Sequence, residues 1–312
     1  MTMDISMTDG SCDSGNSSHE IQHAYDVIAV MLRQEATSYK RVMYDQSPLR
    51  EKLREESVDG SWRQRIVEWM YGVVDHCNLH RDSVAVAAYF LDLSAVRGLV
   101  STRRDFQLAA MTSLMMSIKL YESTSVKLES MVKLGRGLFT TDDVVAMESK
   151  ILNAMNWLVH PPTPICFMRQ FLRLLPSKSS VARYMVVEVS RFISEITTCL
   201  YKFIEYPSSV MAYASMLIAM ERIDALTLSV HEREHFMRSV RECTGLESMS
   251  EIVLRAVRDL RKSLEHNVNL EDLLQTIDAH CQSEQLLQSQ SMVATSKGAR
   301  GTDSPRDVAD VI

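Results

Sequence analysis

Four ionisable residues in the first half of the sequence stand among apolar residues at helical spacing: Arg63, Asp92, Lys119 and Glu148. Each has apolar neighbours three or four positions away, and residues at that spacing share one face of a helix. Burying a charge without a partner is costly, so we expect these side chains to be paired where helices meet. Their signs alternate along the chain, and the four charges can therefore neutralise one another.

The pairing that these positions favour would place a polar spot on an apolar surface. Arg63 with Asp92 would join two consecutive helices, and Lys119 would lie beside Glu148. Such a spot can bind the backbone carbonyl and amide groups of a partner protein. A simpler interpretation stays open for Lys119, whose ammonium could reach water or pair with Glu122 three residues later.

The stretch "HEREH" (231–235) matches the His-Glu-x-x-His pattern of zinc-dependent hydrolases. In that chemistry His231 and His235 would bind Zn²⁺ and Glu232 would act as the base, while Glu251 could be a third protein ligand. However, the motif is five polar residues in a row on an expected short surface helix, whereas the helix of a zinc protease carries apolar residues that bury it. We therefore keep a zinc hydrolase as the weakest alternative, and we expect neither a metal nor another cofactor.

The composition of the 312-residue chain favours long helices, because only 10 glycines and 7 prolines are available for turns. The formal net charge of −6 argues against general binding to nucleic-acid phosphates. No apolar run reaches the length of about 18 residues that a membrane span needs, so we expect no membrane partner. The six cysteines contain no CxxC pair and are typical of reduced thiols, which favours the nucleus and the cytoplasm as the location.

The helical signals fall into two sets separated by the helix-breaking stretch "HPPTP" (160–164). The two sets are similar in length and in number of helices, which suggests two copies of one α-helical unit. The sequence therefore predicts an all-α protein with two tandem five-helix domains, an N-terminal helix and disordered termini. The expected division is residues 1–18 disordered, 19–58 the N-terminal helix and a charged connector, 59–160 the first domain, 161–265 the second domain, and 266–312 a short helix and a disordered tail.

These residues and their surroundings resemble the cyclin box. The signature of the first box in cyclins is Arg, Asp, Leu, Lys and Glu, matched here by Arg63, Asp92, Leu108, Lys119 and Glu148. The stretch "MESKILNAMNWLVHPPTP" (147–164) is similar to the family's Met-Glu-x-x-Ile-Leu-x-x-Leu-x-Trp-x-x-x-x-Pro-Thr-Pro, and "YPSSVMAYASM" (206–216) resembles a second cyclin box. The resemblance covers roughly 20–264 and leans towards a divergent G1 or D-like type.

The resemblance implies a regulatory subunit rather than an enzyme. Cyclins bind a cyclin-dependent protein kinase and hold its αC helix inward, which permits the Lys–Glu ion pair that orients the phosphates of ATP. The chain would thereby control cell-cycle progression. The residues that would support the box from within are Arg63, Asp92 and Leu108, and those that would contact the kinase are Lys119, Leu120, Tyr121, Glu122, Glu148, Ile151 and Leu152.

Cyclins of the A, B and E types also bind Arg-x-Leu peptides of kinase substrates or inhibitors, on a patch that begins on the first helix of the box. Gly72 stands here where the family has an acidic residue, and Arg65 would repel a basic peptide. We therefore expect the docking of Arg-x-Leu peptides to be weak or altered. The residues of this candidate docking patch are Trp62, Arg65, Trp69, Phe106 and Gln107.

A second use of the same fold is a transcription-associated adaptor built from two cyclin-like repeats, which binds DNA and polymerase. That alternative predicts a basic surface and an N-terminal zinc ribbon. The acidic net charge and the lack of CxxC pairs in the sequence count against both features, so we expect no nucleic-acid partner.

Overall fold

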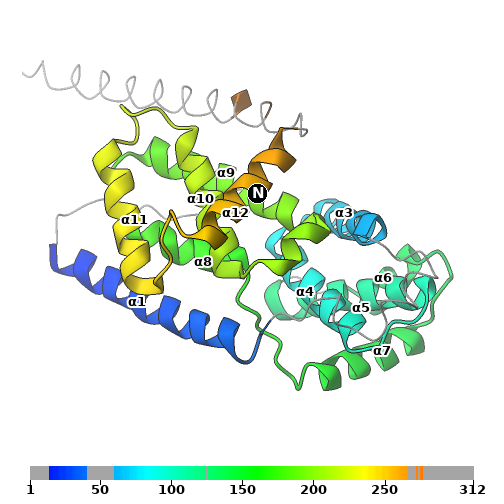
Figure 1. The fold of residues 1–312 in the computed structure, drawn as a ribbon. Coiled ribbons are helices and arrows are strands. Elements are labelled where there is room, and N and C mark those ends of the chain that lie inside the picture. The colour runs from blue at the N-terminus through cyan, green and yellow to red at the C-terminus, as the bar shows by residue number, and fades with distance from the viewer. Residues whose placement is uncertain (1–13, 41–59, 124–125, 266–271, 273–274, 277–312) are drawn as a thin grey trace, which may run out of the picture. The chain divides into compact units, whose positions relative to one another are not determined.

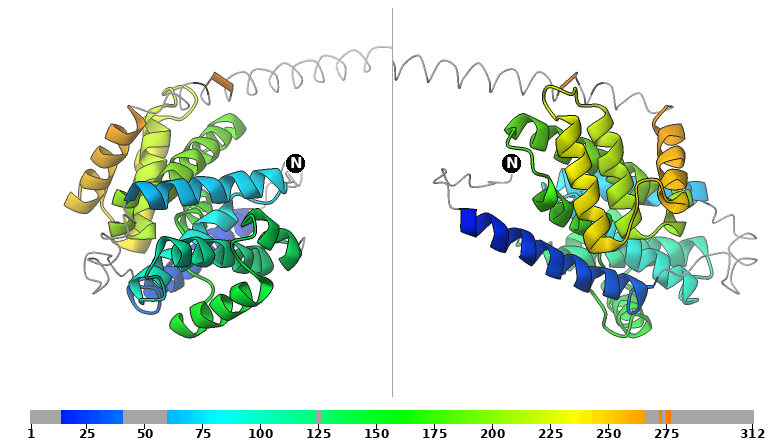
Figure 2. Two further views of the ribbon diagram at one scale, coloured as in Figure 1. Left: turned by 90° about the vertical axis from the view of Figure 1, so that its right-hand side faces the viewer. Right: turned by 60° about the vertical axis from the view of Figure 1, so that its left-hand side comes forward.

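The computed structural model of the chain describes residues 14–40, 60–123, 126–265, 272 and 275–276 (Figures 1 and 2). Over these residues the regular secondary structure is helical and contains no strand, which confirms the expected all-α class. None of the described helices is both long enough and apolar enough to cross a membrane.

The first helical set consists of α3 (Gly60–His76), α4 (Asp82–Val96), α5 (Arg103–Tyr121), α6 (Leu128–Leu134) and α7 (Thr141–Ala154). Helix α5 is its centre, because all the other four helices pack against it (Figure 1). Every side chain of α5 from Ala109 to Ile118 is buried. Because α5 is enclosed on all sides, its position in the set is fixed, and so are the positions of the side chains at its two ends.

Capping boxes mark the first residues of α5 and α7. In this motif an N-cap threonine and a residue three positions later satisfy each other's backbone N–H groups. At α5, Thr102 Oγ1 accepts from Asp105 N and Asp105 Oδ2 accepts from Thr102 N, both at 3.1 Å. At α7, the corresponding distances between Thr140 and Asp143 are 3.2 and 2.9 Å. The start of each helix is thus encoded locally, and it determines which later positions face the core.

The second helical set consists of α8 (Pro164–Phe171), η2 (Leu172–Leu174), α9 (Ser180–Cys199), η3 (Tyr201–Glu205), α10 (Ser208–Glu221), α11 (Val230–Thr244) and α12 (Glu251–Leu264). Helix α10 has the place here that α5 has in the first set, since it packs against α8 and α9 and is buried along most of its length. The two sets therefore follow one plan, a buried central helix with others around it, as expected for two copies of one unit.

Helix α1 (Ser14–Ala36) precedes both sets and packs against α8, η2 and α11 of the second (Figure 1). The sequence predicted a separate helix from about residue 19, but the helix begins at Ser14, inside the stretch expected to be disordered. It is not separate either, because Ala24, Ile28 and Met31 on one of its faces are buried.

The C-terminal end of α1 is attached both to the second set and to the segment between the sets. Pro207, the N-cap of α10, has no side chain that can accept a hydrogen bond from the first turn of the helix. The carboxylate of Glu35 accepts these hydrogen bonds in its place. It accepts from Ser209 N at 3.1 Å and from Ser209 Oγ at 2.6 Å. Just beyond α1, the hydroxyl of Tyr39 accepts from His160 N at 3.1 Å. Residues far apart in the sequence thus complete the helix ends that local residues leave open.

The contacts divide the chain into two units, Met1–Ser263 and Leu264–Ile312. Both helical sets lie in the first unit, apart from the last residue of α12. In the second unit, the described residues include a hydrogen bond from Thr276 Oγ1 to Asp272 O at 2.8 Å. Most of the charged connector, residues 1–13 of the expected disordered N-terminus and most of the expected tail lie outside the described residues.

Replacing Glu35 with alanine removes the carboxylate that caps α10 and leaves the buried Ser209 without this acceptor. We expect Glu35→Ala to lower the free energy of unfolding by about 1–2 kcal/mol, the usual result of losing a cap. Urea denaturation followed by circular dichroism measures this change. Glu20→Ala, at an exposed position of the same helix, is the control and should change stability by less than about 0.5 kcal/mol. Equal losses in the two variants would contradict a capping role.

Candidate functional site

Lys119 and Glu148 meet at the edge of the first helical set, from the last turn of α5 and the middle of α7. The Nζ atom of Lys119 lies 2.9 Å from each carboxylate oxygen of Glu148. The side chain of Lys119 is 50% exposed and that of Glu148 is 22% exposed. The structure thus brings together two residues that the sequence predicted to be adjacent. Because the pair is open to solvent, its remaining N–H group and oxygen lone pairs are available to another protein.

Apolar side chains border this pair on both helices. On α5, Leu120 and Tyr121 are exposed. On α7, Val145 is exposed and Leu152 is half-buried, and both share the helix face of Glu148 because they stand three positions before it and four after it. The result is a polar pair framed by apolar surface, which is an arrangement that suits a protein interface.

The segment that follows α7 continues this surface, and the sequence analysis did not identify it. The hydroxyl of Tyr121 lies 2.9 Å from Nδ1 of His160, and the two rings meet edge to face. Trp157, three residues before His160, is exposed and has a left-handed backbone with φ of +60°. A large exposed aromatic side chain next to the helix pair is a candidate contact for a partner. Its only sequence signal is Asn156, since asparagine favours left-handed turns at helix ends.

Ile151 was expected to share this surface, and that prediction was wrong. Its side chain is fully buried, together with those of Val144 and Met147 on the same helix. These positions, spaced by three and four residues, form the core-facing side of α7. Glu148 follows Met147 by one residue and so lies at the boundary between that side and solvent.

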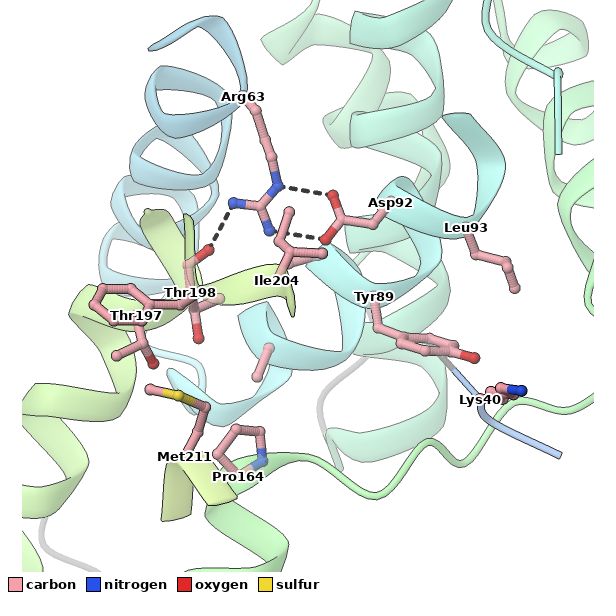
Figure 3. A pocket seen from close by; sticks show the side chains of 13 residues that line it. Lys40, Arg63, Tyr89, Asp92, Leu93, Pro164, Thr197, Thr198, Ile204 and Met211 are labelled. Atoms are coloured by element: carbon pink, nitrogen blue, oxygen red, sulfur yellow. Dashed lines mark hydrogen bonds and ion pairs between the residues drawn. The ribbon is translucent and has the colours of Figure 1, made fainter. Parts of the chain in front are cut away.

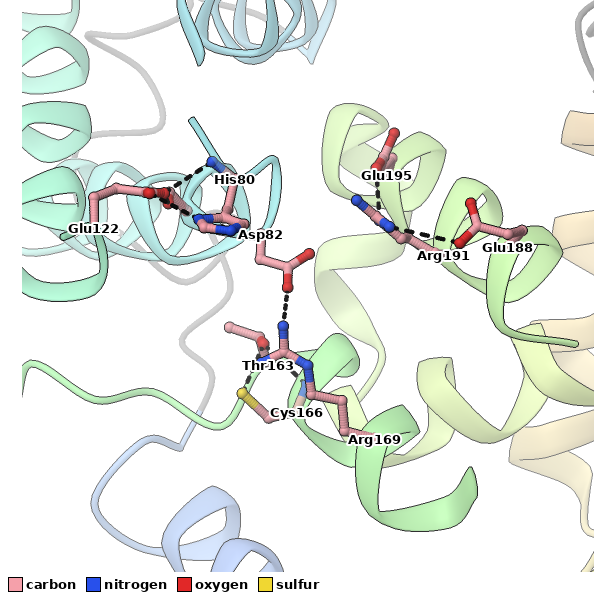
Figure 4. Close-up of polar contacts among 10 residues, drawn as sticks. His80, Asp82, Glu122, Thr163, Cys166, Arg169, Glu188, Arg191 and Glu195 are labelled. Carbon is pink, nitrogen blue, oxygen red and sulfur yellow. Dashed lines mark hydrogen bonds and ion pairs between the residues drawn. The ribbon is translucent and has the colours of Figure 1, made fainter. Parts of the chain in front are cut away.

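Glu122 was also expected to contact a partner, but its side chain is almost fully buried. The chain leaves α5 at this residue, and the carboxylate reaches the start of α4. It accepts hydrogen bonds from Ser83 Oγ at 2.6 Å and His80 N at 3.0 Å, with His80 Nδ1 at 2.8 Å (Figure 4). Burial raises the pKa of Glu122, but these hydrogen bonds together outweigh burial and hold the pKa below its usual value. Glu122 therefore stabilises the neighbouring helix instead of facing a partner.

Arg63 and Asp92 form a largely buried ion pair between α3 and α4, as the sequence predicted (Figure 3). Nε and Nη2 of Arg63 donate to the two carboxylate oxygens of Asp92 at 2.7 and 2.8 Å. Nη1 donates to the backbone oxygens of Thr198 at 2.9 Å and Cys199 at 3.0 Å, in the last turn of α9, where carbonyls lack helical partners. One guanidinium group thus joins the two helical sets. Leu108, expected to support the same set, is partly buried against its apolar core.

Further ion pairs cross the junction between the sets. Arg81, before α4, contacts Asp75 on α3 at 2.8 Å and Glu195 on α9 at 2.9 Å. Asp82, at the start of α4, contacts Arg169 of α8 (Figure 4). Burial raises the pKa of Glu195 above its usual value, against the opposing attraction of Arg81. Glu195 and Arg169 lie far from their partners in the sequence, so residue spacing does not reveal these two contacts.

A cavity of about 90 Å³ lies beside the Arg63–Asp92 pair, between the two sets (Figure 3). Pro164, Thr197 and Met211 of the second set contribute to its lining. A volume of this size holds a few water molecules and is smaller than the sites that bind organic cofactors. We therefore assign it a place in the packing of the junction.

A larger groove of about 310 Å³ lies between α3, α5 and the segment that joins α6 to α7. Four residues of the candidate docking patch line it: Trp62, Arg65, Trp69 and Gln107. Phe106 does not, because its side chain is fully buried in the core of the first set, so that prediction was wrong. The groove is completed by residues that the sequence analysis missed, namely Ile66, Met111, Leu134, Gly135, Arg136, Leu138 and Phe139. The sequence "GRG" (135–137) indicates a turn, but nothing in it places that turn opposite α3.

The "HEREH" stretch lies in the first half of α11, where Glu232 caps the helix. Its carboxylate accepts from Ser229 N at 2.8 Å and from Ser229 Oγ at 2.7 Å. These hydrogen bonds lower the pKa of Glu232. The helix is longer than the short surface helix expected, and Phe236 and Val240 bury one side of it. Within the part of the chain that the structure describes, no three His, Cys, Asp or Glu side chains are grouped as metal ligands.

Comparison with known proteins gives two matching family models: the cyclin N-terminal domain over residues 26–160 and the cyclin C-terminal domain over residues 162–295. Cyclin-A2-3 of Arabidopsis thaliana is 25% identical over 170 residues, which are 54% of this chain and 38% of that protein. Cyclin-B2-2 of Oryza sativa subsp. indica is 26% identical over 210 residues, which are 67% of this chain and 47% of that protein. The matched region thus spans less than half the length of either relative.

Among solved structures, a viral cyclin from herpesvirus saimiri is similar to this chain with a TM-score of 0.56 and 12% sequence identity. The similarity covers 77% of this chain and 96% of the viral one. At that identity it concerns the fold, and the fold it supports is the pair of helical sets described above.

Removing the Arg63 guanidinium would take two charge-assisted hydrogen bonds from the carboxylate of Asp92 and one hydrogen bond from each of two backbone carbonyls. We expect Arg63→Met to lower the free energy of unfolding by about 3 kcal/mol, measured by urea denaturation. In Arg63→Met/Asp92→Leu both charges of the ion pair are removed, so the loss of stability should be smaller than in the single variant. A double variant as unstable as the sum of the two single variants would contradict this coupling.

Glu122 makes stability depend on pH. Because its pKa is lower in the folded chain, its hydrogen bonds add stability that is present above the ordinary pKa of 4.5 and is lost as the pH falls through the lowered pKa. We expect Glu122→Gln to be less stable than the parent chain at neutral pH, with a difference that shrinks below pH 4.5. Urea denaturation at a series of pH values measures the difference. Glu129→Gln, exposed on α6, is the control. A constant difference between the parent chain and Glu122→Gln would speak against this role.

Proposed function

The chain belongs to the cyclin family, and we propose that it is a regulatory subunit that binds and activates a cyclin-dependent protein kinase. The observation that carries the proposal is the solvent-open Lys119–Glu148 pair, framed by exposed apolar side chains on the first cyclin domain. Control of cell-cycle progression and a location in the nucleus and the cytoplasm belong to the same proposal.

Each part of this surface has a chemical task in the proposed complex. The Lys119 ammonium donates to backbone carbonyl oxygens of the kinase, and the Glu148 carboxylate accepts from its N–H groups. Leu120, Tyr121 and Leu152 add apolar area that is removed from water on binding. The pair already exists before the partner arrives, so binding does not have to order both side chains anew.

Activation follows from the kinase conformation that this surface favours. A protein kinase is active when its αC helix is held inward, so that a lysine and a glutamate pair and orient the phosphates of ATP. A subunit that binds only this conformation shifts the kinase towards it by its difference in affinity for the two states. The first cyclin domain is suited to this task because its central helix α5 is enclosed and the surface on it is fixed. In this proposal all catalytic groups belong to the kinase.

Replacing Lys119 and Glu148 together tests the proposed interface. We expect Lys119→Ala/Glu148→Ala to weaken binding to a cyclin-dependent kinase by about tenfold or more, because kinase backbone groups lose their charged partners in the interface. A pull-down with purified cyclin-dependent kinases, followed by a histone phosphorylation assay, measures binding and activation. Lys150→Ala removes an exposed positive charge from the same helix and should change neither.

The outcomes separate the interface from the function. Equal activation by the parent chain and the double variant would reject the interface, whereas failure of the parent chain to bind any cyclin-dependent kinase would reject the function. Circular dichroism of the double variant identifies a folding defect, which we do not expect because exposed ion pairs contribute little to stability.

A further inference from the structure

The groove between α3, α5 and residues 134–139 is separate from the Lys119–Glu148 surface, since the two share no residue. Its volume of about 310 Å³ is sufficient for one or two large apolar side chains. Trp62, Ile66 and Trp69 form one wall, at positions four and three residues apart on α3. Leu138 contributes to the lining from the segment that joins α6 to α7 and is exposed, so apolar surface is left in contact with water.

Among the described residues that line this groove, every charged side chain is basic. They include Arg65 and Arg136, and no described aspartate or glutamate belongs to the lining. A third arginine, Arg103, places its guanidinium carbon 5.1 Å from the centre of the Trp62 ring. In a chain with a formal net charge of −6, this is a local concentration of positive charge.

The lining arginines have donors left for a ligand. Arg65 contacts the carbonyl oxygen and the hydroxyl of Ser61 at 3.4 Å each, and its guanidinium carbon lies 5.7 Å from the Trp62 ring centre. Hydrogen bonds of this length are weak, and no carboxylate of the described residues pairs with Arg65. Arg136 is exposed in a left-handed turn with φ of +49°, next to Gly137 at +80°. An arginine is strained in that conformation, which a glycine would adopt freely.

We propose that this groove binds a segment of a partner protein in which large apolar side chains stand next to aspartate or glutamate residues. The apolar side chains would leave water for the tryptophan-lined wall, and the carboxylates would accept paired hydrogen bonds from the guanidinium groups. The same arginines repel a segment rich in lysine or arginine. This preference for acidic segments does not depend on kinase binding.

Selection from random peptides displayed on phage, with the full chain immobilised, tests the proposal without assuming a partner. We expect the enriched peptides to carry Asp or Glu beside Leu, Phe, Met or Trp. The most enriched peptide is then synthesised, together with a counterpart in which lysine replaces each acidic residue. Fluorescence polarisation should show at least about tenfold tighter binding of the acidic peptide, with a ratio that falls as the salt concentration rises.

Variants of the chain connect this preference to the groove. Arg65→Glu should weaken binding of the acidic peptide by about tenfold. The difference in affinity between the acidic peptide and its lysine counterpart should shrink or change sign. Leu138→Ser, at an exposed position, should weaken binding of the acidic peptide through loss of apolar contact. Arg238→Glu makes the same charge change at an exposed position of α11, outside the groove, and should leave binding unchanged.

Enrichment of basic peptides, no enrichment of any peptide, or equal weakening by Arg65→Glu and Arg238→Glu would overturn the proposal. All three variants should bind a cyclin-dependent kinase as the parent chain does, which also confirms that they are folded. If the parent chain binds the kinase but shows no preference for acidic peptides, this proposal alone is rejected. If the parent chain shows that preference but binds no cyclin-dependent kinase, the proposed function alone is rejected.

Discussion

The hydrogen bonds of the buried Arg63 guanidinium join the two cyclin domains. It donates to both carboxylate oxygens of Asp92 in the first domain and to two backbone oxygens at the end of α9 in the second. A planar group with five donors can satisfy a carboxylate and two carbonyls at once, which the smaller ammonium of a lysine cannot do with the same geometry. The side chain of Arg63 therefore links α3, α4 and α9 and helps to fix the positions of these three helices relative to one another.

Two ion pairs in the first domain each join residues 29 positions apart, and burial decides what each pair does. In Arg63–Asp92 the arginine is only 4% exposed, so the hydrogen bonds of its guanidinium are made within the chain and losing one partner is costly. In Lys119–Glu148 the lysine is half exposed, so the pair adds little to stability but keeps polar atoms accessible. The same pairing of charges is thus structural at one place and available to a partner at another.

Much of the fold could be predicted because it depends on local signals, such as capping residues, long apolar stretches and a proline-rich break. The contact between Lys119 and Glu148 was predictable from the sequence as well. Each stands as a single charge on an apolar helix face, and where two such faces pack together the charges are favourable only if their signs are opposite. Ile151 and Glu122 were misassigned because nearness to a functional residue along the chain does not specify which side faces the core or where a helix ends. The cap supplied by Glu35 and the second wall of the groove depend on contacts between distant segments, about which residue spacing carries no information.

The attachment of α1 has a consequence for how the chain is made. Glu35 and the residue that it caps, Ser209, are 174 positions apart. At a typical synthesis rate of about 5–20 residues per second, roughly ten seconds or more pass on the ribosome between the two. Ile28 and Met31, which are buried in the finished protein, lie on a helix whose packing partners α8, η2 and α11 all follow it in the sequence. Helix α1 can therefore complete its packing only after α8, η2 and α11 have been synthesised.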